Sequence, residues 1–304
     1  MKVAVEKKAA FQGHKDSIFA LAGDYDSSRF YTAGGDGLIA EWDIEKPGEG
    51  TLLAKLDGSS YTALFERNHN KLIVAQNHLG VHLIDLDSRK HEKSIQLSTC
   101  PFYSLLTDGN LLFAGGGNGI IYMLDLTTYE LKHQFKLSDK SCRTLAKHPT
   151  EPIIAAGYSD NNIYIISLKT HEVYPIKEAH RNSVFCLSFS PDGKYLISGG
   201  RDAHLNIWST DDWSLHENIL AHMYTINFIE FAKDGRHFAT ASKDKTIKIW
   251  DAGSFKLLKV IDKPRHGGHG NSVNKLLWKK RERQLVSCSD DRSAMVWHLQ
   301  FNEL

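Results

Sequence analysis

The sequence predicts an all-β protein built from seven copies of one short unit. A strand ending in tryptophan or an aliphatic residue returns every 40-odd residues along the 304-residue chain. Three polar residues keep fixed distances from the tryptophan in four of the units. Within each unit, short strands of alternating pattern are separated by turn residues, and a period of this length is typical of repeat architectures.

The spacing of four tryptophans gives the number of units. Trp208 and Trp250 are 42 residues apart, Trp250 and Trp297 are 47 apart, and 166 residues separate Trp42 from Trp208. The last interval fits four periods averaging 41.5 residues. The apolar strands GVHLIDL, IIYMLDL and NIYIISL stand at the expected places, with Ile84, Leu124 and Ile166 where the tryptophan would be. The chain therefore has seven units.

Each tryptophan-containing unit also carries a histidine, a Ser or Thr, and an Asp at constant offsets. The hydroxyl residue follows the histidine by 18 positions, the aspartate by 22 and the tryptophan by 28. The four sets are His14, Thr32, Asp36 and Trp42; His180, Ser198, Asp202 and Trp208; His222, Thr240, Asp244 and Trp250; and His269, Ser287, Asp291 and Trp297. Such regularity indicates the same structural role in every copy.

The fifth unit shows how each copy divides into strands. VFCLSFS reads as a strand, PDGK as a hairpin turn, and YLISGG and HLNIWS as two further strands, with a fourth around Trp213–Ile219. Asp-Gly recurs at the corresponding turn of other units, where glycine tolerates a positive φ. No amphipathic helix of useful length and no linker interrupts the pattern, so residues 1–304 are expected to form one domain.

These features resemble the WD-repeat β-propeller family, whose units begin with Gly/Ala-His and end with Trp-Asp. The resemblance extends over essentially the whole chain and implies seven four-stranded antiparallel blades around a central channel. It also implies that the His, Ser/Thr, Asp and Trp of one blade form a hydrogen-bonded structural tetrad. Units two to four lack the His and Trp, and we expect their blades to close by apolar packing.

The two ends of the chain predict how the ring closes. Only seven residues follow Trp297, too few for an outer strand and its connection. The segment before His14 looks like the outer strand that precedes other units. We therefore expect residues 3–11 to supply the outermost strand of the last blade, which leaves no blade with a missing strand.

Composition argues against several classes of function. The chain has 37 basic and 36 acidic residues, and this net charge of +1 does not favour nucleic-acid binding. No apolar run is long enough for a membrane, and MKVAVEKKAAFQGH is not a secretory signal. Cys100, Cys142, Cys186 and Cys288 form no CxxC motif and are expected to be reduced and buried in a cytoplasmic protein.

The recurring Ser/Thr, His and Asp invite comparison with a hydrolase triad. A catalyst needs one such set and this chain has four, each with a tryptophan at a fixed place, so the structural role is preferred. The HGGH sequence at His266 and His269 could supply two metal ligands, but His269 already belongs to a tetrad. We expect no catalytic residue, metal, cofactor or small-molecule substrate.

The resemblance also implies where a partner would bind. In WD-repeat proteins, one residue near the start of each inner strand and one just before the structural aspartate surround the channel mouth. The first positions map to Phe19, Thr62, Tyr103, Arg143, Phe185, Asn227 and Asn274, and the second to Gly35, Asn77, Gly117, Ser159, Arg201, Lys243 and Asp290. Aromatic and Arg side chains are enriched in interface hot spots.

The sequence therefore predicts a non-catalytic protein–protein interaction scaffold. Its predicted partner-binding residues are Phe19, Tyr103, Arg143, Phe185, Arg201 and Lys243, and the expected partner is a peptide or protein segment with acidic and apolar side chains. One alternative is that these aromatics merely cap the channel while the cations are solvated. Another is a metal-dependent hydrolase-type propeller, which would need inward-facing ligands clustered at the channel.

Overall fold

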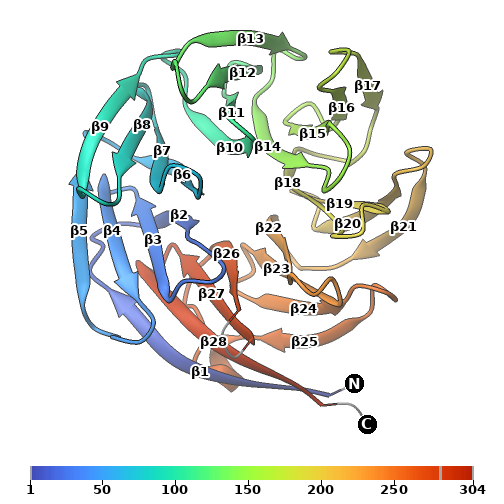
Figure 1. Ribbon diagram of the computed structural model, residues 1–304. Helices are drawn as coiled ribbons and strands as arrows, with labels where there is room; N and C mark the ends of the chain where they lie inside the picture. The colour runs from blue at the N-terminus through green and yellow to red at the C-terminus, as the bar shows by residue number, and fades with distance from the viewer. Residues whose placement is uncertain (1, 281–282, 303–304) are drawn as a thin grey trace.

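Seven antiparallel sheets of four strands each are arranged in a ring around a central channel (Figure 1). The computed structural model describes residues 2–280 and 283–302. This architecture confirms the predicted seven-bladed propeller. Each blade places its first strand at the channel and its fourth at the rim, because neighbouring first strands contact one another around the ring and β26 contacts β2.

The strands follow one another blade by blade along the chain. Blade one is β2 (Ile18–Ala22), β3 (Arg29–Gly34), β4 (Leu38–Asp43) and β5 (Gly50–Lys55); blade two is β6 (Ser60–Glu66), β7 (Lys71–Gln76), β8 (Gly80–Asp85) and β9 (Lys90–Ile95); blade three is β10 (Phe102–Asp108), β11 (Leu111–Gly116), β12 (Ile120–Asp125) and β13 (Leu131–Lys136); blade four is β14 (Cys142–Lys147), β15 (Ile153–Tyr158), β16 (Ile163–Ser167) and β17 (Val173–Ile176); blade five is β18 (Val184–Phe189), β19 (Tyr195–Gly200), β20 (His204–Ser209) and β21 (Leu215–Leu220); blade six is β22 (Ile226–Phe231), β23 (His237–Ser242), β24 (Ile247–Asp251) and β25 (Leu257–Ile261).

Blade seven combines the two ends of the chain. It contains β26 (Val273–Lys279), β27 (Gln284–Ser289) and β28 (Ser293–Asn302), and its outermost strand is β1 (Lys2–Gln12). The register of β1 on β28 runs from Lys2 opposite Asn302 to Gln12 opposite Ser293, and Figure 1 shows the two strands side by side. The predicted closure by the N-terminal segment is confirmed. A single helical turn, α1 (Lys263–His266), precedes β26.

The fourth strand of blade five begins later than the sequence pattern suggested. β21 starts at Leu215, whereas Trp213 lies in the preceding turn with a φ of 60°. The turn is closed by a hydrogen bond from the Trp213 N–H to the Ser209 carbonyl, and the indole packs edge-on against Phe189. A bulky residue in the left-handed region cannot continue a strand. The apolar side chain of Trp213 therefore belongs to the turn and not to the strand that the sequence predicted there.

The apolar core lies between adjacent blades. One cluster joins Phe11 and Val296 of blade seven to Phe30 and Trp42 of blade one, with the Phe11 ring 5.1 Å from that of Phe30 and 5.7 Å from that of Trp42. Similar clusters fill the other spaces between blades. Every blade therefore depends on its neighbours for burial, and the ring is held together by its closure.

Two faces follow from the antiparallel topology. We call the upper face the one formed by the loops entering each first strand and the turns joining the second strand to the third. The lower face is formed by the turns joining the first strand to the second and the third to the fourth. The histidines and aspartates of the four tetrads therefore lie at the upper face.

Candidate functional site

In blade one, the four tetrad side chains form a continuous hydrogen-bonded chain. The Trp42 Nε1–H donates to the Thr32 Oγ1 atom at 2.7 Å, and that oxygen lies 2.8 Å from the His14 Nε2 atom. The His14 Nδ1 atom lies 3.0 Å from Asp36 Oδ1. The carboxylate also accepts the backbone N–H of Lys15. The chain links the upper loop to the second and third strands of its own blade.

The same arrangement recurs in blades five, six and seven. The indole-to-hydroxyl distances there are 2.9, 3.0 and 2.9 Å, the hydroxyl-to-imidazole distances 2.7, 2.7 and 2.8 Å, and the imidazole-to-carboxylate distances 3.0, 2.8 and 2.9 Å. These contacts join the side chains of His180, Ser198, Asp202 and Trp208; His222, Thr240, Asp244 and Trp250; and His269, Ser287, Asp291 and Trp297.

The donor groups of the side chains fix the direction of each hydrogen bond in the tetrads. An indole N–H only donates, so the hydroxyl accepts it and has its own hydrogen available for the Nε2 atom of a neutral imidazole. The Nδ1–H then donates to the carboxylate. Burial opposes the charge of Asp202, but hydrogen bonds from His180 and the Arg181 backbone lower its pKa to about 2. Burial lowers the pKa of His222 below its ordinary value.

This geometry leaves the serine and threonine hydroxyls engaged at both ends. Each one accepts from an indole and faces an imidazole inside the sheet, and Thr32, Ser198, Thr240 and Ser287 are all buried. A hydrolytic serine instead needs an exposed oxygen beside a stabilised carbonyl site. The arrangement supports linking strands within a blade rather than attack on a substrate.

The tetrads predict a specific loss of stability in acid. Burial lowers the pKa of His222 in the folded state. Below pH 6.5, the unfolded chain therefore binds a proton that the folded chain does not, so the free energy of unfolding falls as pH decreases. Asp202 adds a further loss from pH 3.8 down through about 2, because its folded pKa is below the ordinary value. Each such proton contributes a slope of about 1.4 kcal/mol per pH unit. Urea unfolding between pH 8 and 4 measures the first loss. His222→Gln should show a shallower decline than wild type, and parallel curves would contradict this linkage.

Blades two to four are not closed by apolar packing alone, so that expectation is wrong. In blade two, the His82 Nε2 atom lies 2.8 Å from Gln76 Oε1 and its Nδ1 atom lies 2.9 Å from Ser94 Oγ. Tyr122 accepts from Asn118 at 2.8 Å, and Tyr164 donates to Asp160 at 2.9 Å. Each of these blades therefore has a shorter polar network of its own.

The substitute rings share one place in the blade. His82, Tyr122 and Tyr164 stand opposite Val74, Ala114 and Ala156, which occupy the register of the tetrad hydroxyls. Without that hydroxyl and without the tryptophan, a ring on the third strand takes this place: His82 and Tyr122 are buried, and Tyr164 is half-buried. Because a buried ring with a polar atom needs a hydrogen-bond partner, the network is rebuilt around it.

A β-bulge near the upper end of every inner strand defines the first set of channel-mouth positions. The register of the inner pair shifts at Phe19, Tyr61, Tyr103, Arg143, Phe185, Asn227 and Asn274. In blade two the sequence mapping is off by one residue. It assigned Thr62 to the channel mouth, but Thr62 is buried and Tyr61 occupies the bulge. The extra residue of a bulge re-aims its side chain, which explains the common position.

The second set of positions lies beside the first. The backbone N–H groups of Gly35, Asn77, Gly117, Ser159, Arg201, Lys243 and Asp290 each donate to the carbonyl of the residue preceding an inner strand, at 2.7–3.0 Å. Arg201 and Lys243 are exposed. Both sets therefore lie on the upper face, and the sequence mapping of the second set matches this geometry in every blade.

Five bulge residues form a contiguous arc over blades one to five, which we call the aromatic arc: Phe19, Tyr61, Tyr103, Arg143 and Phe185. The ring centres of Phe19 and Tyr61 are 5.3 Å apart, and those of Tyr61 and Tyr103 are 5.6 Å apart. The Arg143 Cζ atom lies 4.2 Å from the Tyr103 ring centre and 4.5 Å from that of Phe185. The guanidinium is held between two rings.

The electrostatic situation of Arg143 is unusual. Burial lowers the pKa of its guanidinium, while Tyr103 acts in the opposite direction. Arg143 forms no salt bridge with any residue that the structure describes. An arginine remains protonated in proteins, so the arc holds a partly desolvated positive charge.

Blades six and seven end the arc with asparagines that join neighbouring blades. The Asn227 Nδ2 atom donates to the Val273 carbonyl at 2.8 Å. The Asn274 Nδ2 atom donates to the Ile18 carbonyl at 2.9 Å and to Asp290 at 2.7 Å. These two amides link blade six to seven and seven to one, so their polar atoms are engaged within the protein.

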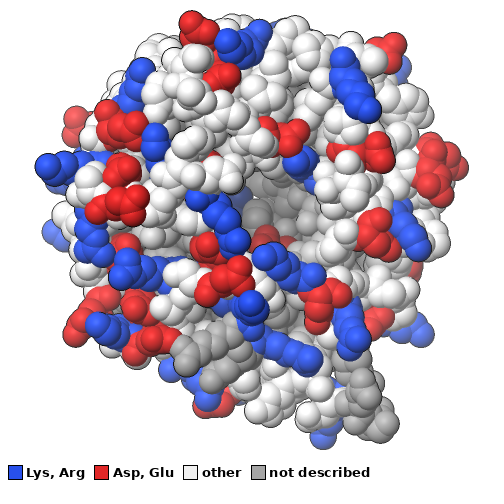
Figure 2. Space-filling model, in the orientation of Figure 1, with Lys and Arg blue, Asp and Glu red and all other residues white. Residues whose placement is uncertain are grey.

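The channel holds a cavity of about 380 Å³ whose lining includes Glu230 and Lys275. Burial raises the pKa of Glu230 to about 8, with Lys275 acting in the opposite direction. Figure 2 shows one face of the disc hollowed at its centre, with basic and acidic side chains interspersed around it. Within residues 2–280 and 283–302, no three His, Cys, Asp or Glu side chains are grouped to hold a metal ion.

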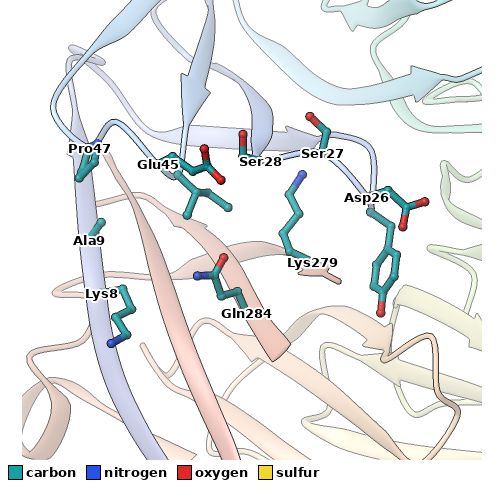
Figure 3. A pocket seen from close by; sticks show the side chains of 11 residues that line it. Lys8, Ala9, Asp26, Ser27, Ser28, Glu45, Pro47, Lys279 and Gln284 are labelled. Atoms are coloured by element: carbon teal, nitrogen blue, oxygen red, sulfur yellow. The ribbon is translucent and has the colours of Figure 1, made fainter. Parts of the chain in front are cut away.

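A second cavity, of about 460 Å³, lies where blade seven meets blade one (Figure 3). Lys279 extends along it and donates to the backbone carbonyls of Asp24 at 2.7 Å and Arg29 at 2.6 Å. Burial lowers the pKa of this lysine to about 8. In the sequence, Lys279 begins the basic run at 279–283, for which a solvated hairpin turn is the expectation. The structure instead places Lys279 at the end of β26 with its side chain buried. Its contacts add a polar link across the closure of the ring.

The state of the cysteines and the length of the helices can be compared with the expectations of reduced, buried thiols and of no membrane span. All four cysteines are free; Cys142, Cys186 and Cys288 are buried, whereas Cys100 is half-buried. Burial raises the pKa of the Cys142 and Cys288 thiols to about 12. In the described part of the chain, no helix has the length and apolar character that a membrane crossing requires.

Comparison with known proteins identifies the repeat. The family model described as "WD domain, G-beta repeat" matches residues 5–43, 172–209, 214–251 and 259–298. Each match contains one complete set of Ser/Thr, Asp and Trp positions, and together they cover just over half of the 304 residues. A search of curated proteins gave no match. The matched segments and the seven-bladed ring show that this chain belongs to the WD40 repeat family.

Proposed function

We propose that this protein is a non-catalytic scaffold that binds a peptide or protein segment on its upper face. WD40 propellers are generally protein-interaction scaffolds. The observation that carries the proposal for this chain is the aromatic arc, with Arg143 held between Tyr103 and Phe185. We also infer that the closed ring behaves as one domain.

The chemistry of the arc favours a segment with apolar and acidic side chains. Tyr61 and Tyr103 present large, half-buried rings at the channel mouth. Such rings supply contact area at low conformational cost, and Arg and Tyr dominate interface hot spots. A partly desolvated guanidinium without a carboxylate partner gains most from an acidic group that excludes the remaining water.

The double variant Arg143→Ala/Phe185→Ala tests the binding face. We expect it to weaken binding of the physiological partner at least about tenfold, since hot-spot truncations typically cost about 2 kcal/mol or more. Affinity purification with mass spectrometry identifies partners of the wild type, and titration of a purified partner gives the affinities. Unchanged affinity would exclude this face.

A matched control variant distinguishes loss of the binding face from loss of folding stability. Val173→Ala/Tyr174→Ala also removes two apolar side chains, but from the exposed rim strand β17 of blade four. It should bind the partner as wild type does. Thermal melting of both variants shows whether the ring is intact, and Arg143→Met retains the apolar stem if the double variant is unstable.

The alternative of a metal-dependent hydrolase makes a different prediction. It would require a metal in stoichiometric amount with the purified protein, held by residues at the channel such as Glu230. Elemental analysis of protein purified without chelators distinguishes the two. The tetrad histidines and aspartates contact each other within single blades, which favours the scaffold.

A further inference from the structure

Four exposed cations gather on the upper face of blades five and six. Arg181 lies in the loop entering blade five, Arg201 in that blade's upper turn, and Lys243 and Lys245 in the upper turn of blade six. None of the four forms a salt bridge with a described residue. The corresponding turns of blades one and three carry Gly35 and Gly117. Exposed cations also lie on other upper loops, at Lys15, Lys140 and Arg292, but blades five and six carry four of them on adjacent loops.

Backbone contacts make these loops one continuous surface. The Arg201 N–H donates to the Ser183 carbonyl at 3.0 Å, which joins the two basic loops of blade five. The Ala221 N–H donates to the Ala203 carbonyl at 3.0 Å and connects them to the loop entering blade six. The Lys243 N–H donates to the Thr225 carbonyl at 2.9 Å and adds the last turn.

Two exposed apolar side chains lie inside this basic sector. Met223 is 82% exposed and Tyr224 is 59% exposed, and both belong to the loop entering blade six, between β21 and β22. A methionine is a flexible, polarizable contact residue, and a tyrosine presents a flat ring with a polar end. We call Arg181, Arg201, Met223, Tyr224, Lys243 and Lys245 the basic–apolar patch.

The carboxylates of the same sector do not neutralise the patch at its surface. Asp202 and Asp244 have side chains only 10% and 6% exposed, because they accept hydrogen bonds from His180 and His222 beneath the loops. Glu178 is the exposed carboxylate of the entering loop. The outermost charges over blades five and six are therefore mainly positive.

The patch continues the aromatic arc. Phe185 ends the arc and lies two residues after Ser183, whose carbonyl accepts from Arg201. A segment crossing the channel mouth along the arc would reach the patch without leaving the upper face. The two surfaces are thus placed for one partner chain.

We propose that the basic–apolar patch binds an acidic stretch of the same partner segment that occupies the arc. Carboxylates of the segment pair with Arg181, Arg201, Lys243 and Lys245, and an apolar side chain packs on Met223 and Tyr224. This inference rests on the proposed function. Charge complementarity selects an acidic occupant. The exposed apolar pair and the chain's net charge of +1 favour a protein segment over a nucleic acid.

A random 12-residue peptide library displayed on phage provides the probe. Selection on the purified wild-type protein should enrich peptides that combine Asp or Glu with aromatic or aliphatic residues. The best synthetic peptide should bind Arg201→Glu/Lys243→Glu at least about tenfold more weakly than wild type, with affinity that falls as salt rises. Selected peptides without acidic enrichment would overturn the proposal.

The same two blades offer a matched control. Lys194→Glu/Arg236→Glu reverses two exposed charges on the lower turns of blades five and six, and should change the affinity less than about twofold because the face is different. Equal weakening by both charge reversals would indicate only long-range electrostatics and overturn the patch.

The variants separate this inference from the proposed function. If Arg143→Ala/Phe185→Ala abolishes peptide binding but Arg201→Glu/Lys243→Glu leaves it intact, the arc binds and the patch does not. If neither variant affects binding, or if no peptide is selected, both proposals fail. Tighter binding of a 12-nucleotide single-stranded DNA than of the acidic peptide would also overturn the proposal.

Discussion

Deleting residues 2–11 is expected to destabilise the whole ring. The deletion removes β1 from blade seven and exposes the length of β28. It also removes Val3 and Phe11, which are buried, and burial of such side chains contributes about 1.5–3 kcal/mol each. With the lost ladder hydrogen bonds, the cost should reach about 5 kcal/mol or more, and the melting temperature should fall by roughly 10 °C.

Calorimetry of the full chain and the deletion variant measures this effect. The substitution Phe11→Ala serves as a graded control, because it leaves the strand in place and removes only the contacts with Phe30 and Trp42. Adding a synthetic peptide of residues 2–14 to the deletion variant should restore part of the loss. A melting temperature within 2 °C of the full chain, as an approximate limit, would show that closure contributes little.

The second large effect is expected from Trp297→Ala in blade seven. Trp297 is completely buried, packs in the core between blades six and seven, and donates to Ser287 Oγ at 2.9 Å. Truncating a buried tryptophan costs about 3–5 kcal/mol, and the hydroxyl of Ser287 also loses its donor. Urea unfolding monitored by circular dichroism gives the change in free energy of unfolding.

Two further variants separate volume from hydrogen bonding. Trp297→Phe keeps much of the apolar volume and removes the indole N–H, so its cost should be smaller than that of the alanine variant. Trp213→Ala removes a tryptophan from the lower turn of blade five, where the side chain is only half-buried, and should cost much less. If Trp213→Ala lowered the free energy of unfolding as much as Trp297→Ala, the tetrad position would contribute no more to stability than a tryptophan in a turn.

The sequence predicted the four tetrad blades more fully than the other three. In blades one, five, six and seven, the constant offsets aligned every position, so Phe19, Phe185, Asn227 and Asn274 mapped to the bulges directly. Blade two lacks those markers, and the mapping there missed Tyr61 by one residue. Because side chains alternate along a strand, a slip of one residue exchanges a channel-facing ring for a buried threonine.

The polar networks of blades two to four also lay beyond sequence reasoning. His82 and Gln76 are close in the chain, but nothing in their types indicates that they hydrogen-bond across two strands. Their meeting depends on the register of β7 and β8, which only the folded sheet supplies. The buried Lys279 is similar, since its carbonyl partners lie about 250 residues away in blade one.

Repetition let the sequence determine the number of blades, the four tetrads and the closing role of the first strand. Those features depend on local spacing, and copies at fixed offsets reveal spacing without any coordinates. The tertiary structure alone decided which residues from different loops and blades meet. These contacts place Arg143 between the rings of Tyr103 and Phe185, link blades six, seven and one through two amides, and make the patch around Met223 continuous. The contacts of Arg143 and of the two amides join residues roughly one or more repeat lengths apart, and their geometry is set by how neighbouring blades pack in a closed ring. The backbone contacts of the patch join residues 18 positions apart, and they depend on how each entering loop meets the upper turn beside it.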